Sequence, residues 1–176
     1  MPQTLVEVDP HGAERPVRAD PAVFPTANAS SLGRLSRNGK RLAIYTLGAT
    51  SPLAVLDLER GTSTSLTDRW DNPNPVWVLD DSRIVFSSNR GSGANNLWWQ
   101  RSDGSGEAER LTTSNHRQTA YSWFPAARVV AYTDIDPNSG SDIWTLSIDG
   151  RKAQPLVRTS AEESAPAFSP DGQWIA

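Results

Sequence analysis

The chain has 176 residues, and 17 Lys and Arg against 20 Asp and Glu give a formal net charge of −3. A nucleic-acid-binding protein typically carries an excess of basic residues on one face, and this chain has no such excess, so we expect no nucleic-acid partner. The absence of cysteine excludes disulfides and thiolate metal sites, and no apolar run reaches the roughly 18 residues that a membrane span needs.

Two short β-like runs, Thr4–Asp9 and Glu14–Arg18, come first and are joined by a turn at His11-Gly12. Four similar segments follow, each with a leading apolar residue, a turn and a second apolar run. They are Leu35–Ala43, Trp77–Val85, Trp123–Ala131 and Phe168–Ala176. Their leading residues are 42, 46 and 45 positions apart. Recurrence at a nearly fixed period indicates a repeat architecture.

A second marker has the same period. It is a further β-like run, found at Ala54–Leu58, Leu97–Arg101 and Ile143–Ser147. Each run is followed by a glycine turn and a closing pair: Leu66-Thr67, Leu111-Thr112 and Leu156-Val157. Tight hairpin turns are indicated by Asn38-Gly39, Asp103-Gly104, Asp149-Gly150 and Asp171-Gly172. No window has a sustained 3.6-residue apolar period, so we expect almost no helix.

Four short antiparallel strands repeated every 42 to 46 residues are typical of a β-propeller blade. We therefore predict an all-β chain with one propeller region over residues 1–176. Its expected repeats are 1–23 (the second half of a blade), 24–67, 68–112, 113–157 and 158–176 (the first half of a blade).

The repeat resembles the TolB-like propeller repeat, a WD-repeat-like unit that reads aromatic-Ser-Pro-Asp-Gly, then Ile/Val-Ala-Phe, then Asp-Ile-Trp, then Leu-Thr. The matching segments are Phe168–Gly172, Asp142–Trp144, Arg110–Thr112 and Ser65–Thr67. In two units Leu79–Asp81 and Pro125–Ala127 replace Pro-Asp-Gly, which predicts looser hairpins there. TolB-like rings usually have six blades, so the resemblance implies about four blades' worth of a six-bladed ring.

A four-bladed ring, closed by joining the two half blades, is the alternative that the repeats leave open. We favour the fragment of a larger ring, because a half-finished strand leaves an open edge that is prone to mispairing.

Phe86–Arg90 through Ala108–Thr112 is most similar in wording to propeller domains attached to bacterial Ser/Thr protein kinases. This resemblance implies an extracytoplasmic module, periplasmic or at the cell surface, that senses or binds a partner within a larger signalling or envelope protein. The alternative is the non-catalytic gating propeller of a prolyl-oligopeptidase-type serine peptidase. Neither kinase phosphate-loop nor catalytic-loop motifs are found.

The loops between successive blades are expected to converge on the mouth of the central channel, where propellers commonly bind partners. The candidate binding residues are Arg69, Trp70, Asp71, Asn72, His116, Arg117, Arg158, Glu162 and Glu163. Their mixed charge suits a protein or peptide partner, or a small ligand, better than one class of ionic substrate. Ordinary solvated loop polarity is the competing interpretation, as is packing of Trp70 onto the blade below.

The predicted loop Asp134–Asp142 gathers oxygen-bearing side chains at alternate positions, an arrangement that suits Ca²⁺. The candidate ligands are Asp134, Asp136, Asn138 and Asp142. Glycine stands at the seventh rather than the sixth position and Thr145 replaces the bidentate glutamate of an EF-hand. Asx turns in an exposed loop explain the same residues, so we favour no cofactor, with calcium as the alternative.

Catalytic residues are not indicated. His11 falls in a hairpin turn and His116 in a linker, and there is no Gly-x-Ser-x-Gly elbow. We therefore predict that the chain is not an enzyme.

Overall fold

A computed structural model of the chain describes residues 6–17, 31–46, 50–91 and 93–176, and all of its regular elements are β-strands. The all-β prediction is confirmed. Within these ranges there is no helix of the length and apolarity that crossing a membrane requires.

The strands form one hairpin and three four-stranded antiparallel sheets, and in each sheet the strand order follows the chain. The hairpin is β1 (Val6–Val8) and β2 (Glu14–Pro16). The first sheet is β3 (Ser31–Leu35), β4 (Arg41–Thr46), β5 (Leu53–Asp57) and β6 (Ser63–Thr67). The second is β7 (Val76–Val78), β8 (Arg83–Ser88), β9 (Asn96–Arg101) and β10 (Glu109–Arg110). The third is β11 (Arg117–Phe124), β12 (Val129–Asp136), β13 (Gly140–Ser147) and β14 (Lys152–Val157).

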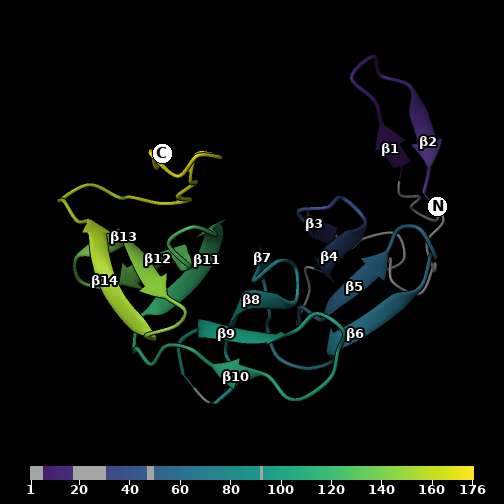
Figure 1. Cartoon of the computed structure of the whole chain (residues 1–176). Helices are drawn as coiled ribbons and strands as arrows, with labels where there is room; N and C mark the ends of the chain where they lie inside the picture. Colours follow the sequence, from purple (N-terminus) through teal and green to yellow (C-terminus); the bar gives the residue numbers. More distant parts are fainter. Residues whose placement is uncertain (1–5, 18–30, 47–49, 92) are drawn as a thin grey trace.

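The three sheets, which we call blades 1, 2 and 3, lie side by side along an open arc (Figure 1). The β1–β2 hairpin lies at one end of the arc and the segment after β14 at the other. Among the described residues β1 and β2 pair only with each other, and Phe168 pairs only with Ile175. The two half blades therefore do not close a four-bladed ring in this structure. The expected repeat boundaries near residues 1–5 and 18–30 lie outside the described residues.

The register of the sheets confirms that the four leading residues of the repeat are equivalent. Each of them pairs with the residue seven positions later on the neighbouring strand. The pairs are Leu35 with Leu42, Trp77 with Ile84, Trp123 with Val130 and Phe168 with Ile175. The same strand-to-strand geometry is thus repeated at each unit.

Blade 2 packs against blade 1 on one face and against blade 3 on the other. Side chains alternate across a strand, so successive residues enter different cores. On β8, Val85 belongs to the core shared with blade 3, whereas Ile84 and Phe86 belong to the core shared with blade 1. Trp77 of β7 also faces blade 1, and its indole N–H donates to the Arg34 carbonyl across the interface (2.7 Å). Stacked blades with an interdigitated core are the packing of a propeller.

Leu35 differs from its three equivalents in the repeat, because 60% of it is exposed. Its equivalents Trp77, Trp123 and Phe168 face the preceding blade, and Phe168 packs on Phe124 with ring centroids 5.5 Å apart. Leu35 faces the β1–β2 hairpin instead, across a hollow of about 790 Å³. A two-stranded hairpin has too little surface to cover the face of a four-stranded sheet.

The hairpin turns follow the predicted chemistry at two of the four leading positions. At Asn38-Gly39 and Asp171-Gly172 the glycine has positive φ (70° and 69°), and the Asn38 or Asp171 side chain accepts a hydrogen bond from the preceding serine hydroxyl. Leu79, Asp80 and Asp81 replace this turn with three consecutive residues of positive φ. Without glycine, this turn holds strained backbone. At Asp149-Gly150 the left-handed residue is Arg151 (φ 47°) rather than the glycine.

Gly104 provides a test of the contact between blades 1 and 2. A Cβ at Gly104 (φ +78°) would lie 2.7 Å from Thr64 Cγ2 of blade 1, whereas a Cβ at Gly106 (φ +71°) meets nothing within 4 Å. Both Gly104→Ala and Gly106→Ala should lose about 1–2 kcal/mol to left-handed strain. We expect a further loss for Gly104→Ala alone in urea unfolding, because only there must a neighbouring blade move. Equal losses would contradict the close approach of the two blades.

Candidate functional site

One end of the sheets carries the linkers between blades together with the loops that join second and third strands. We call this surface the rim and define it by residues 68–75, 89–91, 93–95, 112–116, 137–139 and 158–163. Two linkers and the start of β11 bond to these loops or to the strands beside them. Asp71 N donates to Asn89 Oδ1 (3.0 Å), Gln118 N of β11 donates to Asn95 O (2.7 Å), and Glu163 N donates to Ser141 O (2.9 Å). The rim is therefore a hydrogen-bonded frame rather than a set of independent loops.

Asn72 fixes the first linker from inside. The side chain is fully buried, and its amide nitrogen donates to the carbonyls of Ser51, Arg69 and Trp70 (3.2, 2.6 and 3.1 Å). Its oxygen accepts from Ser88 Oγ (2.9 Å) and Arg90 Nη2 (3.0 Å). Asn72 was expected to contact a partner; in the structure it is a buried amide whose five internal partners position the loop.

Trp70 lies next to Asn72 and projects from the rim. It has a positive φ of 61° and is 43% exposed. The Arg90 guanidinium carbon lies 5.0 Å from the Trp70 ring centroid, and 5.2 Å from each of the rings of Phe86 and Trp98. Burial lowers the pKa of Arg90, with Asp68 opposing the effect. Arg90 thus joins an exposed aromatic ring to the buried core of blade 2 by cation–π contacts.

The second linker is held in the same way by Asn96, a residue for which the sequence offered no functional signal. Asn96 is fully buried. Its oxygen accepts from Ser114 N (3.0 Å) and from Arg110 Nη2, and its amide donates to the carbonyls of Ser114 (3.1 Å) and His116 (3.3 Å).

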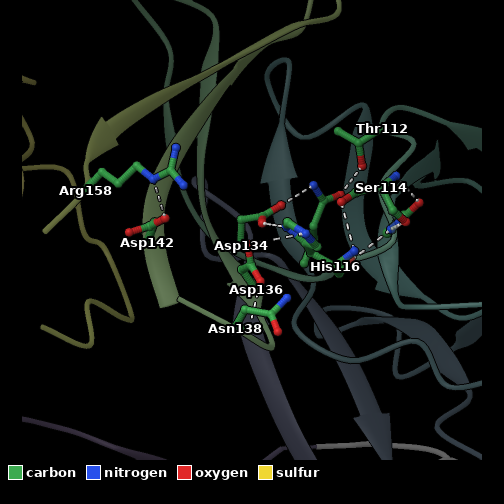
Figure 2. A network of polar contacts seen from close by, with 10 residues as sticks. Thr112, Ser114, His116, Asp134, Asp136, Asn138, Asp142 and Arg158 are labelled. Atoms are coloured by element: carbon green, nitrogen blue, oxygen red, sulfur yellow. Dashed lines mark hydrogen bonds and ion pairs between the residues drawn. The ribbon is translucent and has the colours of Figure 1, made fainter. Parts of the chain in front are cut away.

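His116 is anchored to blade 3 by a chain of polar contacts (Figure 2). Its Nδ1 lies 2.6 Å from Asp134 Oδ1, and its Nε2 lies 3.7 Å from Asp136 Oδ2. The other Asp134 oxygen accepts from Gln118 Nε2 (2.8 Å), and Thr112 Oγ1 donates to Gln118 Oε1. The backbone N–H of Asn138 lowers the pKa of Asp136, and the electrostatic interaction with His116 acts in the same direction. His116 therefore fastens the linker to β12, with 37% of its side chain exposed.

The expected calcium loop is shorter than predicted, because its acidic residues continue the strands. Asp134 and Asp136 lie in β12 and Asp142 in β13, with Asp134 directly opposite Asp142, so that only residues 137–139 form the turn. Asp142 pairs with Arg158 (3.1 Å), and Asn138 N donates to Asp136 Oδ1 (2.8 Å). Across the described ranges no three His, Asp or Glu side chains gather in a way that could hold a metal ion.

The third linker is also tied back to blade 3. Glu162 accepts from Ser141 Oγ (2.5 Å) and Ser141 N (3.2 Å), and Glu163 accepts from the Thr159 hydroxyl. Arg117 was expected in a loop, but it is the first residue of β11 and its side chain is exposed.

The structure thus divides eight of the nine predicted binding residues into two groups and leaves Asp71 between them. Asn72, His116, Arg158, Glu162 and Glu163 make internal contacts that hold the linkers. Arg69, Trp70 and Arg117 point outward, and Arg69 has a side chain that is 75% exposed with a long ion pair to Asp68 (3.8 Å). Asp71 is half-buried, with its backbone held by Asn89. This arrangement can present an aromatic ring and two cations on a rigid frame.

No protein-family model matches the sequence, and the curated proteins give no match. Solved structures do match the fold. A putative TolB from Agrobacterium tumefaciens has a TM-score of 0.74 at 20% identity over 93% of this chain and 56% of that protein. TolB from Acinetobacter baumannii has a TM-score of 0.71 at 18% identity over 94% of this chain and 40% of that one. A structure from a study of two prolyl endopeptidases has a TM-score of 0.62 at 12% identity over 91% of this chain and 26% of that chain.

These likenesses confirm the predicted TolB-like β-propeller fold. The chain spans 56% and 40% of the two TolB structures, so it corresponds to part of each of those proteins.

Proposed function

We propose that the chain is a non-catalytic interaction propeller whose rim binds a protein or peptide partner. We place it, as TolB-like propellers are, outside the cytoplasm as part of a larger bacterial signalling or envelope protein, with a kinase-attached sensor as the specific form. Support comes from the likeness of the fold to two TolB proteins and from the division of the rim into fastening and outward-facing residues.

The observation that carries the proposal is Trp70. An aromatic ring that is 43% exposed, held at positive φ and stacked on Arg90, gives a partner a large apolar surface without side-chain ordering. Tryptophan and arginine dominate the energetics of protein interfaces, and a preorganised contact keeps the entropic cost of binding low. Arg69 beside it adds an exposed cation.

A second candidate is the gating propeller of a prolyl-peptidase-type enzyme, which the likeness to a prolyl endopeptidase favours. In that case the rim would face a catalytic domain of the same protein. Adding a separately produced α/β-hydrolase domain from the same coding region would distinguish the two, since a gate binds that domain and an interaction module does not.

The proposal predicts that Trp70→Ala weakens partner binding while the fold persists. Peptides selected from a displayed random library on the immobilised chain should lose about tenfold or more in affinity on Trp70→Ala, the effect of removing an interface hot spot. Trp174→Ala is the matched control, because Trp174 is the most exposed tryptophan and lies away from the rim. Equal affinities for the two variants, or no peptide enrichment on the wild-type chain, would contradict a rim centred on Trp70.

A further inference from the structure

An open hollow of about 280 Å³ lies between the first strands of the three blades. Its walls include Arg34 and Leu35 from β3, Trp77 from β7, and Tyr121 and Trp123 from β11. Arg37, Asp80 and Asp81, which follow β3 and β7 in the chain, also line it. The rim linkers precede these same strands, so the hollow reaches the opposite end of the sheets from Trp70.

Within the part of the chain that the structure describes, two arginines in this hollow have no acidic partner. The side chains of Arg34 and Arg37 are exposed, and among the described residues neither makes a hydrogen bond or an ion pair through its guanidinium group. Most other arginines of blades 1 to 3 do make such contacts, for example Arg83 with Glu109 and Arg128 with Asp149. Two uncommitted guanidinium groups three positions apart are therefore a local exception.

Of the two acidic residues beside them, Asp81 is already engaged. Asp81 is buried, and its two carboxylate oxygens accept the backbone N–H groups of Arg37 (3.1 Å) and Asn38 (3.4 Å). Asp80 lies in the same turn and is exposed, and its charge helps to raise the pKa of Arg128 after the hydrogen bond that Arg128 donates to Asp149. The turn that holds both aspartates has positive φ at Leu79, Asp80 and Asp81, and strained backbone of this kind often accompanies functional sites.

We propose that this hollow binds an acidic side chain of an extended peptide segment from a protein partner. Arg34 and Arg37 supply the forked donors that a carboxylate accepts in bidentate fashion. Tyr121 and Trp123, both half-buried, supply flat apolar walls for the methylene groups of that side chain. A volume of about 280 Å³ lies at the small end of ligand pockets and suits one or two side chains rather than a folded domain.

The test uses the whole chain with three probes. They are a capped tetraglutamate peptide, the matched tetraglutamine peptide without the charge, and a uronate trisaccharide, which carries carboxylates that do not belong to a peptide. Tetraglutamate should bind at least about tenfold more tightly than tetraglutamine, since charge-assisted hydrogen bonds are the stronger ones, and the affinity should fall as salt is raised. Arg34→Gln with Arg37→Gln should remove that preference. The control pair is Arg60→Gln with Arg101→Gln, two exposed arginines outside the hollow, and it should bind as the wild type does.

A wild-type measurement keeps the proposal falsifiable if the double variant folds poorly. Tetraglutamate should shift the indole N–H resonance of Trp123 and leave that of Trp174 unchanged. Equal binding of tetraglutamine, retention of binding in Arg34→Gln/Arg37→Gln, or a preference for the uronate would overturn the peptide site. Trp70→Ala should leave tetraglutamate binding intact, so failure at the rim and failure in the hollow give different results.

Discussion

Phe86→Ala is expected to lower the free energy of unfolding by about 3–5 kcal/mol, the range for emptying a buried phenylalanine site. Phe86 is fully buried in the core shared by blades 1 and 2. The Arg90 guanidinium carbon also lies 5.2 Å from its ring centroid, so the substitution removes one support of the rim as well. Urea unfolding followed by tryptophan fluorescence measures the change.

Phe168→Ala is the control for this prediction. Phe168 is half-buried in the hairpin after blade 3, where its ring packs on the ring of Phe124. Phe168→Ala should lower the free energy of unfolding by about 1 kcal/mol or less, because folding removes little apolar surface of this half-buried ring from water. Similar costs for both substitutions would mean that the blade 1–blade 2 interface is not the core of the molecule.

Asn72→Asp is expected to destabilise the chain by about 2–4 kcal/mol and to release Trp70 from its place, because buried polar groups without partners are costly. The new carboxylate would face the carbonyls of Ser51, Arg69 and Trp70, which now accept from the amide. Urea unfolding gives the stability, and quenching of Trp70 fluorescence by iodide gives the exposure of the ring.

Asn89→Asp is the matched control on the same rim. Asn89 is exposed and only its side-chain oxygen is used, as acceptor for Asp71 N, so an aspartate keeps the contact. We expect a change within about 0.5 kcal/mol, as for other surface substitutions. A comparable loss in both variants would show that Asn72 does not act through its donated hydrogen bonds.

The repeat could be predicted from the sequence because the blade imposes the same local demands at each turn of the pattern. Leu35, Trp77, Trp123 and Phe168 share one register position, and the Asx-type turns at Asn38 and Asp171 use the same hydrogen bonds. Side-chain alternation and turn chemistry are local properties, and local properties are visible in a sequence.

The division of the rim could not be predicted, since it depends on contacts between distant segments. Asn72 and Asp71 are adjacent in the chain, yet only Asn72 turns inward to Ser51 and Ser88. Likewise, the exposure of Leu35 follows from its neighbouring hairpin, not from its own strand. The aspartates of the expected calcium loop were assigned to a loop, but they lie in strands. A strand can continue through polar residues when the backbone of the opposite strand pairs with it, as the backbone of Asp142 does opposite Asp134.

The proposed function rests on the same division. Residues that fasten the linkers leave Trp70 and Arg69 held outward at one end of the sheets. The hollow between the first strands extends to the other end, where Arg34 and Arg37 lie. A rigid arc with two presented surfaces suits an extended partner better than a small substrate.

Inter-blade distances in solution test this account most directly. A nuclear Overhauser spectrum of the whole chain should connect the indole N–H of Trp77 with the backbone of Arg34 and Leu35, and the ring of Phe168 with that of Phe124, as the 2.7 Å hydrogen bond and the 5.5 Å ring separation require. Spectra in which Trp77 instead contacts the outer strands β6 or β14, with Trp123 and Phe168 in unlike surroundings, would contradict the propeller and both proposed binding surfaces.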